Sequence, residues 1–256
     1  MKRSPLPSFD QLTVRGRRPA LAPGVRIYAV GDIHGRLDLL DELFALIDAD
    51  LALRPIGKPI FVFLGDYIDR GPHSRKTIDR LVERRETNEC VFLKGNHEQI
   101  AINSLKDPAL FQKWMRLGGV ETLVSYGITK FDWMDGKKIV ELQAAFHRAL
   151  PQTHFRFFRD QPTSFTCGDF FFAHAGVKPR IELPRQSESD LLWIRDEFLS
   201  CREDFGKTIV HGHTPTLEIE VRPNRINIDT GAFVTGRLTC LVLEETTLSF
   251  FDTLQT

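Results

Sequence analysis

Long apolar stretches are absent from this sequence of 256 residues. Its longest apolar runs, such as Ile60–Leu64 and Phe170–Ala173, are far shorter than the roughly 20 residues that a membrane-spanning helix needs. The N-terminal residues also lack the continuous apolar core of a secretory signal. These absences predict a chain with no membrane partner.

Cysteine is scarce and dispersed. The four cysteines lie at least 34 residues apart, so no Cys-x-x-Cys pair exists. This spacing excludes a zinc ribbon and a thioredoxin-type redox motif. Dispersed thiols in a chain of this size are typical of a reduced protein, and they predict a cytoplasmic location. The four residues are Cys90, Cys167, Cys201 and Cys240.

A net charge is absent as well, because 34 lysines and arginines balance 34 aspartates and glutamates. A neutral chain has no general electrostatic attraction for the phosphate backbone of nucleic acid or for an anionic membrane surface. No nucleic-acid partner is therefore expected, and the pattern gives no indication of an oligomeric state.

Basic residues and prolines recur in residues 1–24. Short charge-biased termini are usually solvated, so we expect a basic, proline-bearing N-terminal arm that is disordered or loosely docked. Residues 25–256 then form one domain, with a helical insert at about residues 101–155 that is a candidate lid. The apolar face of this lid would consist of Trp114, Met115, Leu117, Leu123 and Val124.

Three short apolar segments, Val25–Val30, Ile60–Leu64 and Cys90–Leu93, read as strands. The first is followed by a helical apolar period over Arg36–Leu51, and the second by a helix that Ser74 could cap. A strand–loop–helix pattern repeated three times predicts an α/β fold with parallel strands. Because ligands bind beyond the carboxyl ends of such strands, we expect the three loops to meet at one edge.

The pattern changes to β-structure from Thr163 onward. Ser164–Thr166 and Phe170–Phe172 flank a turn and read as a hairpin. A helix is expected over Ser187–Leu199. Further strands are expected at Lys207–Val210, Leu217–Val221, Arg225–Ile228, Leu238–Glu244 and Leu248–Asp252. One domain with two sheets is the simplest interpretation.

Potential metal ligands follow these strands in glycine-flanked turns. An isolated Asp-x-His is more often a turn or a helix cap than a ligand, but five such clusters in order are hard to obtain by chance. The mixture of carboxylates, imidazoles and an amide suits manganese, iron or zinc better than calcium. The clusters contain Asp32, His34, Asp66, Asp69, Asn96, His97, His174, His211 and His213.

Five sequence blocks resemble the signatures of phosphoprotein phosphatases, the serine/threonine branch of the calcineurin-like metallophosphoesterases. The resemblance spans about residues 25 to 250 and implies two packed β-sheets flanked by helices, an α/β/β/α sandwich. The blocks are Gly31-Asp32-Ile33-His34-Gly35, Gly65-Asp66-Tyr67-Ile68-Asp69-Arg70-Gly71, Gly95-Asn96-His97-Glu98, His174-Ala175-Gly176 and Gly212-His213-Thr214.

The resemblance implies two divalent metal ions, manganese first and iron or zinc as alternatives. One ion would be held by Asp32, His34 and Asp66. The second would be held by Asp66, which bridges the two, with Asn96, His174 and His213. The resemblance leaves His211 as a residue near the site but not a ligand. We expect the isolated His147 and His154 to be surface or packing residues.

The resemblance also implies roles for the remaining residues. Arg70 and Arg195 would bind the phosphoryl oxygens, since a guanidinium offers a bidentate fork to phosphate. His97 would protonate the departing oxygen and Asp69 would orient His97. Hydrolysis would be one in-line attack by a hydroxide held between the two metals, with no phosphoenzyme.

Two catalytic functions remain open at this point. The leading interpretation is a phosphomonoesterase acting on phosphoserine and phosphothreonine in proteins, and the alternative is a hydrolase of dinucleoside polyphosphates such as diadenosine tetraphosphate. Asp69 before Arg70 favours the protein phosphatase, because symmetrical dinucleotide hydrolases usually replace that aspartate. The segment from Trp114 to Gly127 resembles the insert of the dinucleotide branch instead. A non-catalytic module predicts gaps in the ligand set, and the sequence has none.

Overall fold

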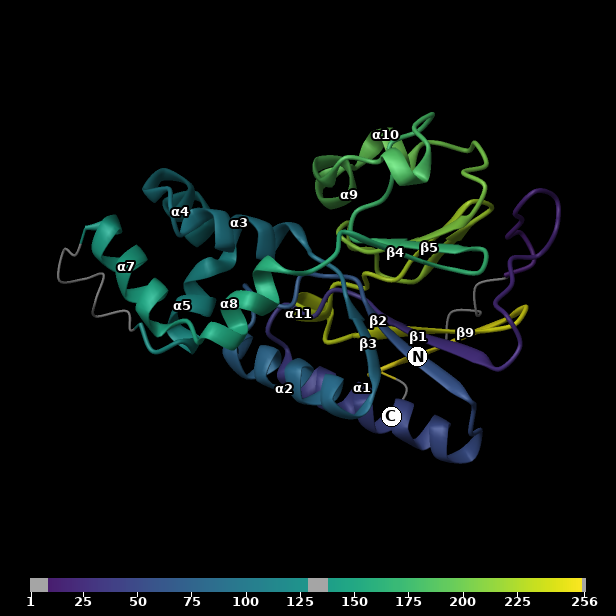
Figure 1. Cartoon of the computed structure of the whole chain (residues 1–256), viewed down its shortest axis with the longest axis horizontal. Coiled ribbons are helices and arrows are strands. Elements are labelled where there is room, and N and C mark those ends of the chain that lie inside the picture. Colours follow the sequence, from purple (N-terminus) through teal and green to yellow (C-terminus); the bar gives the residue numbers. More distant parts are fainter. Residues whose placement is uncertain (1–8, 129–137, 255–256) are drawn as a thin grey trace.

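The computed structural model describes residues 9–128 and 138–254. Two five-stranded sheets pack face to face, and helices cover the outer face of each (Figure 1). The expected α/β fold with two sheets flanked by helices is confirmed.

The first sheet has the order β10-β9-β1-β2-β3. Strands β1, β2 and β3 run parallel, as the repeated strand–loop–helix pattern predicts, whereas β9 is antiparallel to β1, and β10 is antiparallel to β9. The strands are β1 (Val25–Val30), β2 (Lys58–Phe63), β3 (Glu89–Phe92), β9 (Thr239–Glu244) and β10 (Thr247–Asp252).

Helices α1 (Leu37–Leu53) and α2 (Ser74–Thr87) cover the outer face of this sheet (Figure 1). Leu40, Phe44 and Ile47 recur at helical spacing along α1 and are buried against it. Ser74 is not the expected cap. It lies inside α2, and its hydroxyl accepts a hydrogen bond from the backbone N–H of Asp69.

The second sheet has the order β4-β5-β6-β8-β7, with β5, β6 and β8 parallel. The expected hairpin is present as the antiparallel pair β4–β5. The strands are β4 (Ser164–Cys167), β5 (Phe170–Ala173), β6 (Thr208–His211), β7 (Glu220–Arg222) and β8 (Arg225–Asn227).

Two short helices, α9 (Glu188–Trp193) and α10 (Asp196–Leu199), lie on the outer face of the second sheet (Figure 1). A single helix over Ser187–Leu199 was expected, and this expectation is wrong in one respect. Ile194 is extended and Arg195 has φ −133° and ψ −104°, so the helix is interrupted at these two residues. The break places Arg195 at the start of α10.

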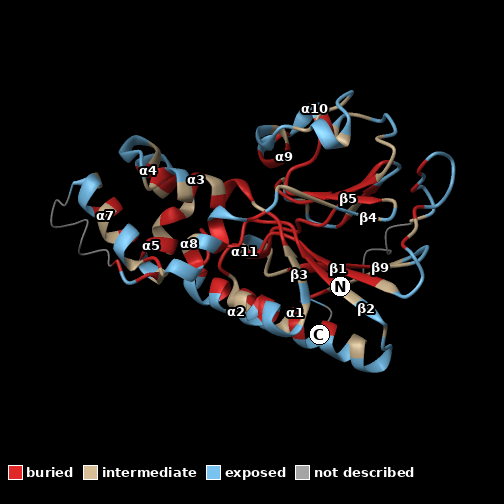
Figure 2. Ribbon diagram, in the orientation of Figure 1, coloured by how far each residue is buried: buried red, intermediate tan, exposed pale blue. Residues whose placement is uncertain are grey.

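Apolar side chains from the inner faces of both sheets form one buried cluster. Strands of both sheets are coloured as buried in Figure 2. Leu12 and Leu21, from the segment preceding β1, are buried in that same core. Arg17 pairs with Asp169 across this contact. Residues 9–24 are therefore packed against the domain, unlike the loosely docked arm that the composition suggested, because their scattered leucines carry the contact. Residues 1–8 lie outside the described residues.

The helical insert occupies one end of the molecule (Figure 1). The segment Met115–Gly119 lies between α4 and α5 and is kinked, because Gly118 has a non-helical φ of 113°. The kink reorients the helix that follows. The single apolar face expected for a lid is therefore wrong, since Leu117 and Val124 are exposed. The helices are α3 (Asn96–Ser104), α4 (Pro108–Trp114), α5 (Val120–Ser125), α7 (Ile139–Ala149) and α8 (Gln152–Arg159).

The remaining short elements are a 3₁₀ turn over Leu183–Arg185 and α11 (Ala232–Thr235). Within the described ranges, no helix combines the length and apolar character that crossing a membrane requires.

Candidate metal centre

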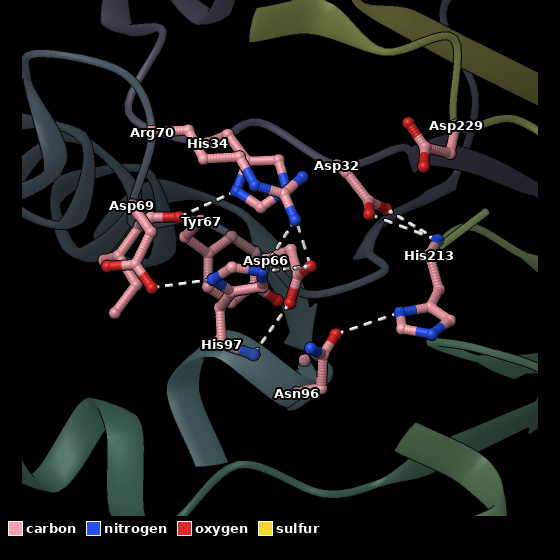
Figure 3. Close-up of polar contacts among 12 residues, drawn as sticks. Asp32, His34, Asp66, Tyr67, Asp69, Arg70, Asn96, His97, His213 and Asp229 are labelled. Atoms are coloured by element: carbon pink, nitrogen blue, oxygen red, sulfur yellow. Dashed lines mark hydrogen bonds and ion pairs between the residues drawn. The ribbon is translucent and has the colours of Figure 1, made fainter. Parts of the chain in front are cut away.

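The loops that follow β1, β2 and β3 meet at one edge of the first sheet, as expected from their parallel direction. Loops after β5 and β6 of the second sheet reach the same place, so six predicted ligands converge. Figure 3 labels each of them except His174. They are Asp32 and His34 after β1, Asp66 after β2, Asn96 after β3, His174 after β5 and His213 after β6, and all are buried.

The backbone is unusual at this edge. His34, Asp66, Asp69, Arg70 and His213 all have φ between 47° and 73°, in the left-handed region that residues with a Cβ rarely adopt. Such conformations cost free energy and persist only where surrounding contacts enforce them. Their concentration at the carboxyl ends of the strands marks this edge as a functional site.

The first ligand cluster consists of His34, Asp66 and His97. Asp66 Oδ2 lies 3.5 Å from His34 Nε2 and 3.8 Å from His97 Nε2. Arg70 donates to both imidazoles, at 2.8 Å to His34 Nε2 and 3.0 Å to His97 Nε2 (Figure 3). The guanidinium therefore occupies the space between these two rings.

The second cluster consists of Asp66, His174 and His213, with Asn96 between the two histidines. Asn96 Oδ1 lies 2.8 Å from His174 Nε2 and 3.0 Å from His213 Nδ1. Asp66 Oδ1 lies 3.4 Å from His174 Nε2. Asp66 thus presents one oxygen to each cluster, which is the arrangement expected of a bridging carboxylate.

The protonation of these histidines can be read from their other ring nitrogens. His174 Nδ1 lies 2.9 Å from the carbonyl of Leu64, and His34 Nδ1 lies 2.8 Å from the carbonyl of Ile68. A carbonyl can only accept, so each Nδ1 carries the proton and each Nε2 turns a lone pair into the site. This is the usual support of a metal-binding histidine.

These residues fit divalent cations. His174 Nε2 and Asn96 Oδ1 are both acceptors, and acceptors this close repel each other unless a cation satisfies them. His213 Nε2 is buried and has no hydrogen-bond partner among the described residues. Burial is the main cause of a lowered pKa in two of these histidines: the pKa of His34 falls to about 3 and that of His213 to about 2. Both rings therefore stay neutral, as metal ligands must.

Asp32 lies beside both clusters, although it belongs to neither three-residue group. Its Oδ2 accepts from the backbone N–H of His213 at 3.1 Å. Burial, followed by the charges of Asp229 and Asp66, raises the pKa of Asp32 well above its ordinary value. Burial also acts to raise the pKa of Asp66, but His174 and the other histidines act in the opposite direction and hold that pKa below its ordinary value. This concentration of carboxylates favours a bound cation.

Asp69 and His97 form a buried pair, with His97 Nδ1 2.7 Å from Asp69 Oδ2. Burial lowers the pKa of His97, but the carboxylates of Asp66 and Asp69 outweigh it and raise the pKa overall. The ring therefore has a fixed orientation and an environment that favours its protonated form.

The two predicted phosphoryl-binding arginines are both exposed. Arg70 reaches into the first cluster and stacks on Phe233, with its guanidinium carbon 4.8 Å from the ring centroid. Arg195 lies near the second cluster. Burial is the main cause that lowers the pKa of His174, and the charge of Arg195 contributes to it.

The other histidines behave as expected. His211 is buried with its ring edge on Phe198 and belongs to neither cluster. His147 is exposed, whereas His154 is buried in a packing contact with Tyr126.

Sequence reasoning assigned no role to Glu98, whose carboxylate binds the backbone of the loops that carry the ligands. Glu98 Oε2 accepts from the backbone N–H of Asp66 at 2.9 Å and of Gly95 at 3.0 Å, and Oε1 accepts from that of Tyr67 at 2.8 Å. It thereby holds the β2 and β3 loops together. The sequence offered one indication of this role. Glu98 lies in the first turn of α3, where an acidic residue can cap backbone N–H groups.

The model of the calcineurin-like phosphoesterase family matches residues 25–238. The chain belongs to this family. As a calcineurin-like metallophosphoesterase it is a hydrolase of phosphoesters whose family implies divalent metals, and the clustered histidines and aspartates agree with that chemistry.

Several curated relatives resemble most of this metallophosphoesterase. The bis(5'-nucleosyl)-tetraphosphatase PrpE, asymmetrical type, of Anoxybacillus flavithermus is 27% identical over 230 residues, which are 83% of this chain and 88% of the relative. The protein of the same name from Oceanobacillus iheyensis is 28% identical over 235 residues, 84% and 87% of the two chains. A zinc-dependent endopolyphosphatase of Saccharomyces cerevisiae is 30% identical over a smaller part, 59% of this chain and 46% of the relative.

Solved structures share the fold at low sequence identity. A candidate diadenosine tetraphosphatase superposes with a TM-score of 0.63 at 19% identity, covering 92% of this chain and 98% of the other. A cold-active protein-tyrosine phosphatase of a psychrophilic Shewanella superposes with a TM-score of 0.54 at 16% identity, covering 90% and 80%. These likenesses confirm the fold.

Proposed function

We propose that this metallophosphoesterase hydrolyses dinucleoside tetraphosphates asymmetrically, giving a nucleoside monophosphate and a nucleoside triphosphate. Two observations together carry the proposal. The ligand clusters converge at one site, and the relatives matched over more than four fifths of the chain are named asymmetrical tetraphosphatases. The substrate is therefore a phosphorylated small molecule, and the phosphoprotein becomes the second candidate.

Two metal sites are part of this proposal. Asp32, His34 and Asp66 hold one divalent ion, and Asp66, Asn96, His174 and His213 hold the other. We expect manganese first, with iron or zinc as alternatives. When bound, such ions supply positive charge that polarises the phosphoryl group and lowers the pKa of water.

The remaining residues act on the substrate directly. Arg70 and Arg195 are exposed, so their guanidinium groups can hold the charged oxygens of a polyphosphate chain. His97, oriented by Asp69, gives its proton to the oxygen that leaves phosphorus. Trp193, with 38% of its surface exposed and its ring 6.3 Å from that of His213, offers an aromatic surface for a nucleobase.

Asp69 had favoured a protein phosphatase, but that argument applies only to symmetrical dinucleotide hydrolases. The relatives here are named as the asymmetrical type, so Asp69 does not count against the present proposal. A specific feature still keeps serine/threonine phosphatase activity as the second candidate, because the buried Asp69–His97 pair would assist a poor alkoxide leaving group.

The test is a paired assay on the purified full-length chain with added manganese. We expect kcat/KM for diadenosine tetraphosphate to exceed that for a phosphothreonine peptide at least tenfold. Product analysis should give AMP and ATP in equal amounts. A larger value for the peptide would overturn the substrate assignment in favour of the protein phosphatase, and two ADP molecules per turnover would overturn the asymmetrical cleavage.

A further inference from the structure

The carboxylate of Asp69 is bound by the helical insert as well as by His97. Its Oδ2 accepts from His97 Nδ1 at 2.7 Å and from the indole Nε1 of Trp114 at 2.8 Å. Its Oδ1 accepts from the hydroxyl of Thr122 at 2.6 Å. All four residues are buried, and two of the three donors to the carboxylate come from the insert.

The same segment also binds the backbone on which Asp69 sits. Asp69 and Arg70 have φ 73° and 67°, a conformation that costs free energy. The Thr122 hydroxyl oxygen accepts from the N–H of Asp69 at 2.9 Å, and the carbonyl of Gly118 accepts from the N–H of Arg70 at 3.0 Å. Thr122 therefore donates to the side chain of Asp69 and accepts from its backbone.

The kink at Gly118 brings the insert close enough for these contacts. Gly118 has φ 113°, and a Cβ there would meet Arg70 Cγ at 2.7 Å. A Cβ on Gly119 would meet the indole of Trp114 at 2.6 Å, so the indole packs directly on the backbone.

We propose that Trp114 and Thr122 are positioning residues that fix the Asp69–His97 pair, so that the helical insert sets the orientation of the proton donor. This inference rests on one part of the proposed function, namely that His97 is the donor. To donate, His97 must carry a proton on Nε2 as well as on Nδ1, which requires that Arg70 turn from His97 Nε2 to the substrate phosphate. As the phosphorus–oxygen bond breaks, its electron pair then goes to the leaving oxygen and the proton on Nε2 follows. Without the two insert donors, Asp69 is free to rotate and the imidazole loses its fixed direction.

The first experiment compares leaving groups with the manganese-loaded enzyme. We expect Thr122→Val to lower kcat for phenyl phosphate, a poor leaving group, about tenfold, a fraction of what a proton donor contributes. The same variant should change kcat for 2,4-dinitrophenyl phosphate, a good leaving group, less than about threefold, because that reaction needs little proton transfer. KM should not change, and Thr122→Ser should restore the rate. Trp114→Phe, which removes only the indole N–H donor and part of the ring, should follow Thr122→Val.

A matched control is available in Thr208→Val. Thr208 is also fully buried, and its hydroxyl has no partner among the described residues, so its loss should leave both rates unchanged. Equal losses on both substrates in Thr122→Val would indicate general damage and would overturn the inference. Wild-type rates on phenyl phosphate would overturn it as well.

The second experiment needs no turnover. In the zinc-loaded enzyme, the proton on His97 Nδ1 gives a downfield NMR signal, which His97→Asn identifies by its loss. We expect this signal to broaden by exchange in Thr122→Val and to remain sharp in Thr122→Ser. A signal as sharp in Thr122→Val as in the wild type would contradict the proposed positioning.

These results separate the two proposals. If diadenosine tetraphosphate is not cleaved but the leaving-group difference and the NMR change are found, the substrate proposal fails and the positioning role stands. If the dinucleotide is cleaved and Thr122→Val affects both aryl phosphates equally, only the positioning role fails.

Discussion

Asp66 is the residue on which both ligand clusters depend. One of its oxygens faces His34 and His97, and the other faces His174. Glu98 fixes its backbone, so the carboxylate is presented by a loop that cannot easily move. A single residue thus joins ligands that come from both sheets.

Replacing Asp66 by Asn tests this bridging role. The amide keeps an oxygen that can accept from the N–H of His97, which the carboxylate accepts at 3.1 Å, so the fold should survive. The negative charge that would bridge two ions is lost, and activity should fall on the order of 10³-fold or more. Bound metal should also fall, as measured by elemental analysis of the purified variant.

Asp41→Asn serves as the control, because Asp41 is an exposed residue of α1 that pairs with Arg80. It should keep wild-type activity and metal content. Full activity with full metal content in Asp66→Asn would rule out a shared carboxylate.

At the scale of single elements, the sequence best predicts functional residues that lie directly after a buried strand. Asp32, Asp66 and Asn96 each come directly after an apolar run that ends in glycine, so both their position and their convergence follow from parallel strand direction. The later ligands His174 and His213 obey the same rule on the second sheet. The convergence of these side chains was therefore predictable, and their roles as ligands stay a prediction.

Four features were not predictable, for physical reasons. The break at Arg195 and the kink at Gly118 depend on backbone rotations that apolar periodicity does not specify. The burial of Leu12 depends on a groove that exists only after both sheets have formed. The contact of Trp114 with Asp69 joins residues 45 positions apart, and hydrophobic pattern alone assigns that tryptophan to a core or a lid.

The insert is tied to the body of the protein by a second buried polar contact, which gives a prediction on pH. The Tyr126 hydroxyl lies 2.8 Å from His154 Nδ1, and His154 Nε2 lies 2.9 Å from Asp79 Oδ1 on α2. Burial lowers the pKa of His154 although Asp79 acts to raise it. Below the ordinary histidine pKa of about 6.5 the unfolded chain takes up this proton first, so acid lowers the stability of the fold.

His154→Gln should therefore flatten the fall of Tm between about pH 6.5 and pH 5, since glutamine keeps one acceptor and one donor but cannot be protonated. Thermal unfolding at a series of pH values measures this. The exposed His147→Gln is the matched control and should follow the wild type. A profile for His154→Gln that parallels the wild type would show that His154 does not cause the acid sensitivity.

For the whole molecule, the ligand set links its two halves. Asp32, His34, Asp66 and Asn96 follow strands of the first sheet, whereas His174 and His213 follow strands of the second. Metal held by ligands from both sheets binds only when the sheets are packed together. Binding must therefore stabilise the native state against the unfolded one.

This linkage has a definite size. Manganese at about 100 times its Kd should raise the free energy of unfolding by about 2.7 kcal/mol for each site it fills, and a chelator should remove the gain. Urea unfolding at increasing manganese concentration measures the effect. Calcium, which prefers sites made only of oxygen ligands, should give a smaller gain at equal concentration, because the nitrogens of the three proposed ligand histidines are poor partners for it. A stability that does not respond to manganese over the range where activity rises would mean that the ion acts on the substrate alone, and the sheets would then be joined only by the core between them.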